Sequence, residues 1–207
     1  FRRTCAVARL CDRATGATLA LLSAHFDHAG SDELGSGSAA RRASAALVME
    51  RARAELRNAA DAVIVTGDFN SFSDRAGDCY AALRAAGAGE LRDVRDLGPE
   101  VEAGRAGSSW EGWESNAYAR CRRGDQRYDQ VFVSERVEVL RSCVPEERHR
   151  QGDRWLYASD HLPIVADLLL PAGAGAGTGR GVRWRAAVVV AAAAVAAAVV
   201  VTRRYRS

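Results

Sequence analysis

Lysine is entirely absent from this chain of 207 residues, and each of its 29 basic residues is an arginine. We attribute this bias to coding preference rather than to function. The formal net charge of +3 is also unevenly spread, because six arginines and no acidic residue follow Pro171. Residues 1–170 hold 23 arginines against 26 acidic residues, a net charge of −3. The main part of the chain therefore lacks the basic excess of a strong nucleic-acid binder.

Cysteine patterns that would build a zinc site or a disulfide framework are missing as well. The five cysteines are odd in number and contain no CxxC pair, which argues against both. We favour buried free thiols, and a Cys5–Cys11 bridge across a hairpin is the alternative. A starting methionine is absent too. Because Phe1 lies inside a predicted strand, we expect an N-terminal part to be missing, and no N-terminal signal can be assessed.

The hydrophobic pattern predicts an α/β protein with helices packed on sheet faces. One helix is predicted over residues 39–58, which contain no Gly or Pro, and a second over 79–86 with Asp78 as its cap. Residues 91–115 have weak periodicity and many glycines, so they are predicted to be a long surface loop. Short apolar runs predict strands at residues 4–9, 18–24, 62–66, 128–133, 137–144 and 164–170.

The C-terminal part differs in composition from residues 1–170, which we interpret as one domain. Residues 171–185 predict a flexible Gly/Ala-rich linker, and residues 203–207 form a basic tail. Between them, residues 186–202 start with sixteen consecutive Ala and Val residues, and aromatic residues flank this run where interfacial anchors are expected. We therefore predict an apolar tail helix that crosses a membrane once, and we do not assign the compartment of that membrane. The alternative is a low-complexity tail that is disordered or weakly helical.

Three short polar clusters, at residues 24–28, 66–70 and 158–161, each follow or adjoin an apolar run. In the second, Asp68 and Asn70 are two residues apart, which places both side chains on one face of an extended segment. The carboxylate can deprotonate a water or bind a metal, and the amide can hydrogen-bond a phosphate oxygen. The alternative is an ordinary Asp/Asn turn.

The third cluster places a carboxylate beside an imidazole. Asp160 offers a ligand for a hard metal ion, and His161 offers a donor toward a phosphate. A catalytic histidine needs a partner that fixes its tautomer, and Asp129, near another strand, is the candidate. The alternatives are a polar loop before a strand and a solvated acid at a strand edge.

The first cluster contains two more histidines. His25 is a candidate phosphate donor, with His28 and Asp27 in support. Because Mg²⁺ prefers oxygen ligands, we do not favour metal binding by these imidazoles. Arg41, at the start of the predicted helix, can tie this cluster to the helix by a salt bridge. The alternative, to which we give comparable weight, is a solvated charge on the helix surface. The tryptophans of residues 109–113 can shape a substrate rim or cover a sheet edge.

From about Thr4 to Leu170, the chain resembles the C-terminal part of the endonuclease/exonuclease/phosphatase superfamily, which has the DNase I-like fold. Its pattern is most similar to the bacterial-type metal-dependent hydrolases. The resemblance implies a four-layer α/β sandwich whose N-terminal half is missing here. The matching segments are His25-Phe26-Asp27-His28, Ala40-Arg41 with Ser44-Ala45, Gly67-Asp68-Phe69-Asn70, Arg127-Tyr128-Asp129 and Ser159-Asp160-His161.

The resemblance also implies a role for each residue. Asp68 would activate the attacking water, and Asn70 would position the water or the phosphate. His161, oriented by Asp129, and His25 would stabilise the charged phosphate. Mg²⁺, or Mn²⁺, would be held by Asp160 and Asp68. The family also uses an Asn and a metal-binding Glu upstream of Phe1, and Gln130 stands where it usually has Tyr.

These observations lead to three hypotheses. The first is a Mg²⁺-dependent phosphodiesterase or phosphatase at a membrane, acting on a lipid head group, a small molecule or nucleic acid. The second is an endo- or exonuclease, which the missing basic excess disfavours. The third is an inactive, membrane-tethered scaffold of the same fold. No protein partner is evident from the sequence.

Overall fold

The computed structural model describes most of the chain in eleven pieces. These are residues 3–13, 16–28, 37–71, 79–87, 89–99, 109, 128–145, 149–156, 159–171, 184–191 and 196–202.

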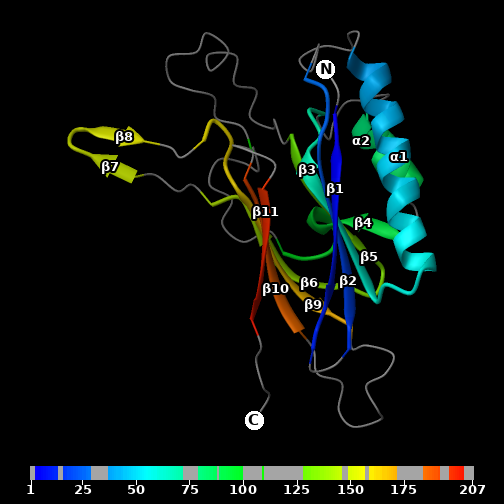
Figure 1. The fold of residues 1–207 in the computed structure, drawn as a ribbon. Coiled ribbons are helices and arrows are strands. Elements are labelled where there is room, and N and C mark those ends of the chain that lie inside the picture. Colours follow the sequence, from blue (N-terminus) through cyan, green and yellow to red (C-terminus); the bar gives the residue numbers. More distant parts are fainter. Residues whose placement is uncertain are drawn as a thin grey trace, which may run out of the picture.

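The described residues form an α/β structure, as predicted, with two α-helices, a short 3-10 helix and strands in three sheets (Figure 1). The helices are α1 (Gly37–Arg57), α2 (Cys79–Gly87) and the 3-10 helix η1 (Val94–Asp96). The strands are β1 (Cys5–Cys11), β2 (Thr18–His25), β3 (Ala62–Asp68), β4 (Leu91–Asp93), β5 (Asp129–Ser134), β6 (Glu138–Cys143), β7 (His149–Gln151), β8 (Arg154–Leu156), β9 (Ile164–Leu170), β10 (Trp184–Ala191) and β11 (Ala196–Thr202).

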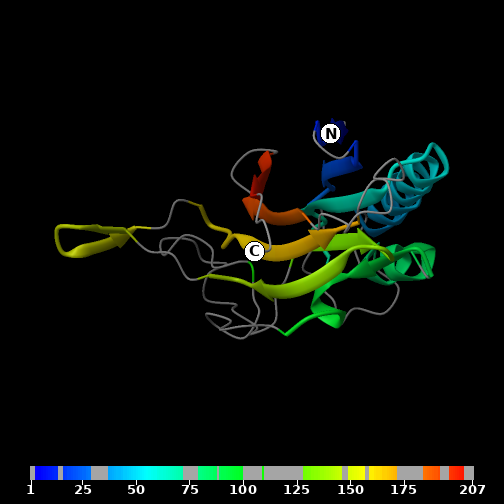
Figure 2. The same ribbon diagram turned by 90° about the horizontal axis from the view of Figure 1, so that it is seen from below.

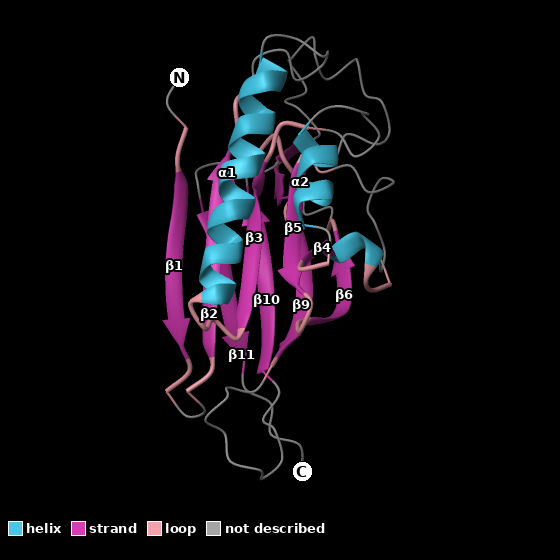
Figure 3. Cartoon of the chain, turned by 90° about the vertical axis from the view of Figure 1, so that its right-hand side faces the viewer, coloured by secondary structure: helices cyan, strands magenta, loops and turns pink. Residues whose placement is uncertain are grey.

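Two sheets and the helices lie in layers. We call the five-stranded sheet, in the order β1-β2-β3-β5-β4, sheet A, and the four-stranded sheet, in the order β11-β10-β9-β6, sheet B. The helices α1 and α2 cover one face of sheet A (Figure 3), and sheet B lies against its other face. The β7–β8 hairpin projects away from these layers in both ribbon views (Figures 1 and 2).

Sheet A separates two apolar cores because successive side chains of a strand point to opposite faces. Ile64 of β3 faces sheet B, whereas its neighbours Val63 and Val65 face the helices. The helices contribute residues three or four positions apart, among them Ala45, Val48, Met49 and Ala52 of α1. Such spacing places them on one helical face. β3 is buried along its whole length, as expected of a central strand with both faces covered.

The predicted strands and helices have counterparts in the structure, but two regions differ. Within the predicted loop 91–115, the described residues contain β4 and η1. A three-residue strand is too short to give a periodic signal. The proposed cap residue Asp78 and the tryptophans of residues 109–113 lie outside the described residues.

The predicted apolar tail helix over 186–202 is not shown, because the described residues of this segment, 186–191 and 196–202, lie in β10 and β11. β10 pairs with β9 over seven residue pairs and β11 continues the sheet. Valine is β-branched and favours strands, and the edge of β9 offers the hydrogen-bonding partner that a single-sequence pattern does not reveal. No helix in the described part of the chain has the length and apolarity to cross a membrane.

Candidate active site

The register of sheet A brings three of the candidate residues into one line. β2 and β3 are parallel, and His25 pairs with Asp68 at their ends. β5 runs antiparallel to β3, and Asp68 pairs with Asp129. The C-terminal ends of β2 and β3 and the start of β5 therefore lie side by side, at the same end of the strands of sheet A.

Gly67 permits this register. Its φ is +149°, and a Cβ atom at this position would lie 1.8 Å from the carbonyl oxygen of Ala24, its partner in β2. Only a residue without a side chain allows the two backbones to come so close. The glycine before Asp68 is therefore a requirement of strand packing as well as the end of the apolar run.

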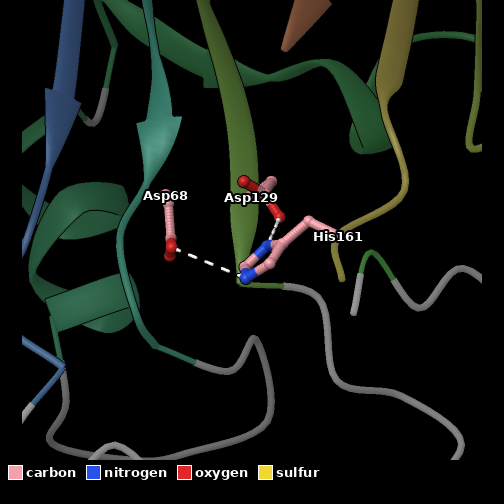
Figure 4. A group of neighbouring side chains, drawn as sticks. All are labelled: Asp68, Asp129 and His161. Carbon is pink, nitrogen blue, oxygen red and sulfur yellow. Dashed lines mark hydrogen bonds and ion pairs between the residues drawn. The ribbon is translucent and has the colours of Figure 1, made fainter. Parts of the chain in front are cut away.

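His161 joins these residues from the segment that leads into β9. Its Nδ1 lies 2.7 Å from Oδ2 of Asp129, and its Nε2 lies 3.8 Å from Oδ2 of Asp68 (Figure 4). Asp129 is fully buried, so the carboxylate that accepts from Nδ1–H is shielded from water. This hydrogen bond fixes the ring and leaves Nε2 facing Asp68.

A second imidazole reaches the same oxygen of Asp68. Nε2 of His25 lies 3.5 Å from Oδ2 of Asp68, and its side chain is 39% exposed. The other oxygen, Oδ1, accepts a hydrogen bond of 2.9 Å from the backbone N–H of Asn70. Asp68 is thus oriented by the backbone and flanked by two imidazoles from different elements.

The protonation states follow from burial and charge. Burial, and after it the charge of Asp129, raises the pKa of Asp68 to about 7, although His161 acts in the opposite direction. Burial alone lowers the pKa of His161, but the charge and hydrogen bond of Asp129 and the charges of Asp68 and Asp160 raise it to about 9. Burial, then the positive charges of Arg3 and His161, lower the pKa of His25. Between pH 7 and 9 a carboxylate therefore lies beside a protonated imidazole.

Asn70 ties the end of β3 to the first polar cluster. Its φ is +49°, in the left-handed region that asparagine tolerates better than most residues. The side-chain Nδ2 donates 3.2 Å to the carbonyl of Phe26, directly after His25 in the chain. In this structure the amide thus organises the site, and its predicted contact with the phosphate stays a prediction.

Arg41 performs a similar task from α1. It is fully buried, and its Nη1 donates 3.1 Å to the carbonyl oxygen of Asp27. This hydrogen bond to the backbone joins the cluster to the helix, and the predicted salt bridge of Arg41 stays a prediction.

Arg3 is a site residue that the sequence interpretation missed. Its Nη2 lies 3.0 Å from Nδ1 of His28 and 3.6 Å from Oδ1 of Asp27. Cys5 pairs with Ala24 in the β1–β2 hairpin, and two further steps of this register place Arg3 opposite Phe26. Extending the predicted hairpin in this way is the signal that could have found it.

The structure does not bring Asp160 into the central cluster. Among the described residues, the group whose ligand atoms all lie within 4.8 Å of one another consists of Asp68, Asp129 and His161. Asp160 instead has its Oδ1 3.4 Å from Oγ of Ser159, and it acts on His161 through its charge.

The carboxylate oxygens of this group suit a divalent cation, and the imidazole does not. Oδ1 of Asp129 is buried and has no hydrogen-bond partner within the described residues, and Oδ2 of Asp68 faces the two imidazoles. Carboxylate oxygens of this kind fit Mg²⁺ or Mn²⁺. The ring of His161 is already engaged through Nδ1 with Asp129, which suits a proton donor better than a ligand of a hard cation.

The fold and site together define an α/β sandwich protein that gathers two buried carboxylates and an imidazole, with ligand atoms within 4.8 Å of one another, at the ends of its central strands. A model of the Endonuclease/Exonuclease/phosphatase family matches residues 4–161. The chain belongs to this family.

Solved structures share the fold. A mannosyl-6-phosphatase from Bacteroides thetaiotaomicron is 25% identical with a TM-score of 0.65, over 80% of this chain and 57% of that one. An endonuclease/exonuclease/phosphatase family protein from the same organism is 25% identical with a TM-score of 0.63, over 80% and 55%.

More distantly, beta toxin from Staphylococcus aureus, solved with bound magnesium ions, is 15% identical with a TM-score of 0.54, over 79% and 57%. This chain therefore spans little more than half the length of these proteins. No curated protein sequence matches it.

Proposed function

We propose that this protein is a divalent-metal-dependent hydrolase of phosphate esters. The supporting observation is the position of Asp68, whose Oδ2 lies 3.5 Å from Nε2 of His25 and 3.8 Å from Nε2 of His161. A carboxylate base beside two hydrogen-bond donors suits water attack on a phosphoryl group. The family membership agrees with this chemistry.

In this mechanism, Asp68 accepts a proton from the attacking water. Its raised pKa of about 7 makes it a stronger base than an ordinary aspartate, yet leaves it ionised at slightly alkaline pH. The backbone N–H of Asn70 holds the carboxylate in its orientation. The charge on the base is therefore fixed in place before the substrate arrives.

The two histidines act on the phosphoryl oxygens. His161, kept protonated and oriented by Asp129, donates through Nε2, and His25, whose Nε2 also faces Oδ2 of Asp68, is the second donor. A bound Mg²⁺ or Mn²⁺ would be held by Asp68 and by Asp129, whose Oδ1 has no hydrogen-bond partner among the described residues, and would neutralise phosphoryl charge.

We infer a small phosphate ester as substrate, with sugar phosphates the first class to test. The support is the mannosyl-6-phosphatase among the structural relatives and the net charge of −3 over residues 1–170, which disfavours a nuclease. The prediction of a membrane-bound lipid substrate depended on a helix over 186–202, where the structure has β10 and β11.

Hydrolysis of a mannose 6-phosphate and of a bis-aryl phosphodiester, with Mg²⁺ and with EDTA, tests the proposal. We expect Mg²⁺-dependent turnover of at least one ester, and a loss of 10²-fold or more in kcat for Asp68→Asn and His161→Gln, on the order of what a general base contributes. Asp153→Asn is the control, because Asp153 is exposed in the turn of the projecting β7–β8 hairpin. Full activity of Asp68→Asn, or metal-independent turnover, would refute this assignment.

A further inference from the structure

The two partners of the Asp129–His161 hydrogen bond come from segments that lead into different sheets. Asp129 is the first residue of β5 in sheet A, whereas His161 precedes β9 in sheet B. Their 2.7 Å contact therefore depends on how the two sheets are held at this end of the molecule. An element that links the two backbones here controls the geometry of the pair.

Ser109 makes contacts with both backbones. Its Oγ accepts a hydrogen bond of 3.1 Å from the N–H of Asp129. Its own carbonyl accepts one of 2.7 Å from the N–H of Leu162, the neighbour of His161. Ser109 is fully buried, so water does not compete for either bond.

Each bond also satisfies a group that would be costly to leave unpaired. The N–H of Asp129 and the N–H of Leu162 belong to buried residues, and a buried backbone donor without an acceptor is strongly unfavourable. Loss of the Ser109 hydroxyl therefore removes this link between the start of β5 and the β9 segment, so the two can shift relative to each other while β5 stays paired with β3. A displacement of about 1 Å at a catalytic group lowers the rate by up to about 10²-fold.

We propose that Ser109 is a positioning residue that sets the distance between Asp129 and His161 by joining the start of β5 to the segment leading into β9. The positional part of this inference stands on the hydrogen bonds alone, and its effect on turnover rests on the proposed function. Neither composition nor periodicity singles out this serine, which lies in the segment predicted to be a surface loop.

The test compares Ser109→Ala, Ser109→Thr and Ser142→Ala in the whole chain. Ser142 is a matched control because it is also fully buried, but its Oγ has no hydrogen-bond partner among the described residues. With the Mg²⁺-supported hydrolysis of the preferred ester, we expect Ser109→Ala to lower kcat by about 10- to 100-fold with KM changed less than about threefold. Ser109→Thr, which keeps the hydroxyl, restores kcat, and Ser142→Ala behaves as wild type.

A second readout does not need turnover. The Nδ1–H proton of His161, identified by its absence in His161→Gln, gives a downfield proton resonance while it is bonded to Asp129. We expect this signal to be lost or shifted in Ser109→Ala and retained in Ser142→Ala, at temperatures where circular dichroism shows both variants folded. If the wild type hydrolyses no ester but the resonance responds, the proposed function fails and the positioning role stands. An unchanged resonance in Ser109→Ala, or equal losses of kcat in Ser109→Ala and Ser142→Ala, would overturn the positioning role.

Discussion

At the scale of single residues, the glycine between Thr66 and Asp68 has the most constrained environment. The Cβ that alanine would add at Gly67 collides with the backbone of β2, and a φ of +149° is rarely adopted by residues with a side chain. Neither neighbour can move easily, because β2 and β3 are both central strands of sheet A.

Gly67→Ala should therefore destabilise the fold by about 3 kcal/mol or more, in the upper range of single substitutions. Gly152→Ala provides a comparison without a clash, since Gly152 lies in the left-handed region with a φ of +61° and has open space around its Cα. We expect it to cost only about 1–2 kcal/mol. Urea unfolding monitored by circular dichroism gives both values, and equal losses would show that backbone strain alone, without the clash, explains Gly67.

At the scale of elements, α1 is fastened to the edge strand β1 by a buried carboxylate. Glu55 accepts hydrogen bonds of 2.6 and 2.9 Å from Nε and Nη2 of Arg9, and Nη2 of Arg51 lies 2.8 Å away. The hydrogen bond from Arg9 lowers the pKa of Glu55. Burial opposes this effect, and the charges of both arginines add to it. This two-point contact joins elements 46 residues apart in the sequence.

Because the folded-state pKa of Glu55 is lowered, its contribution to stability is present above the unfolded pKa of about 4.3 and is lost as the pH falls through the folded value. Glu55→Gln should reduce the free energy of unfolding by about 1–2 kcal/mol at pH 7. It should also make stability less dependent on pH below about 4.3. Urea titrations at a series of pH values measure both, and a slope identical to wild type would contradict this role. Glu90→Gln is the control, since Glu90 is half exposed in its pair with Arg53.

The elements also show what local sequence can predict. The continuous apolar run of β3 and the helical spacing of α1 are local signals, and both elements lie where they were expected. The Ala/Val run is ambiguous, because alanine favours helices and valine favours strands. The free edge of β9 resolves this ambiguity, and no pattern within residues 184–202 contains that information.

The candidate site likewise contains residues that the local sequence predicts and residues that it does not. Asp68, His161, Asp129 and His25 stand out because these polar residues follow or adjoin apolar runs, and the structure places them together. Arg3 and Ser109 do not stand out, since their contacts come from strand register and from a bridge between sheets. Residues identified by a motif were thus predictable, whereas residues defined by long-range packing were not.

At the scale of the whole molecule, the C-terminal hairpin decides where sheet B ends. Truncation after Pro171 removes β10 and β11 and turns β9 into an edge strand with seven unpaired positions. We expect a lower urea midpoint and concentration-dependent aggregation, because an apolar open edge pairs with other chains. Truncation after Thr202, which leaves both strands, should change neither property. An unaltered midpoint after the longer truncation would show that the hairpin adds nothing to the folded sheet.

The pairing of β3 with its two neighbours has one more consequence. The register that places Asp68 beside His25 and Asp129 also decides which side chains of β3 face the helices and which face sheet B. A slip by one residue would exchange the two apolar faces and would put Gly67 or Phe69 in the place of the carboxylate. On the proposed function, turnover would therefore report on strand register, because a chain with a misaligned central strand would be inactive even when its secondary structure looks native.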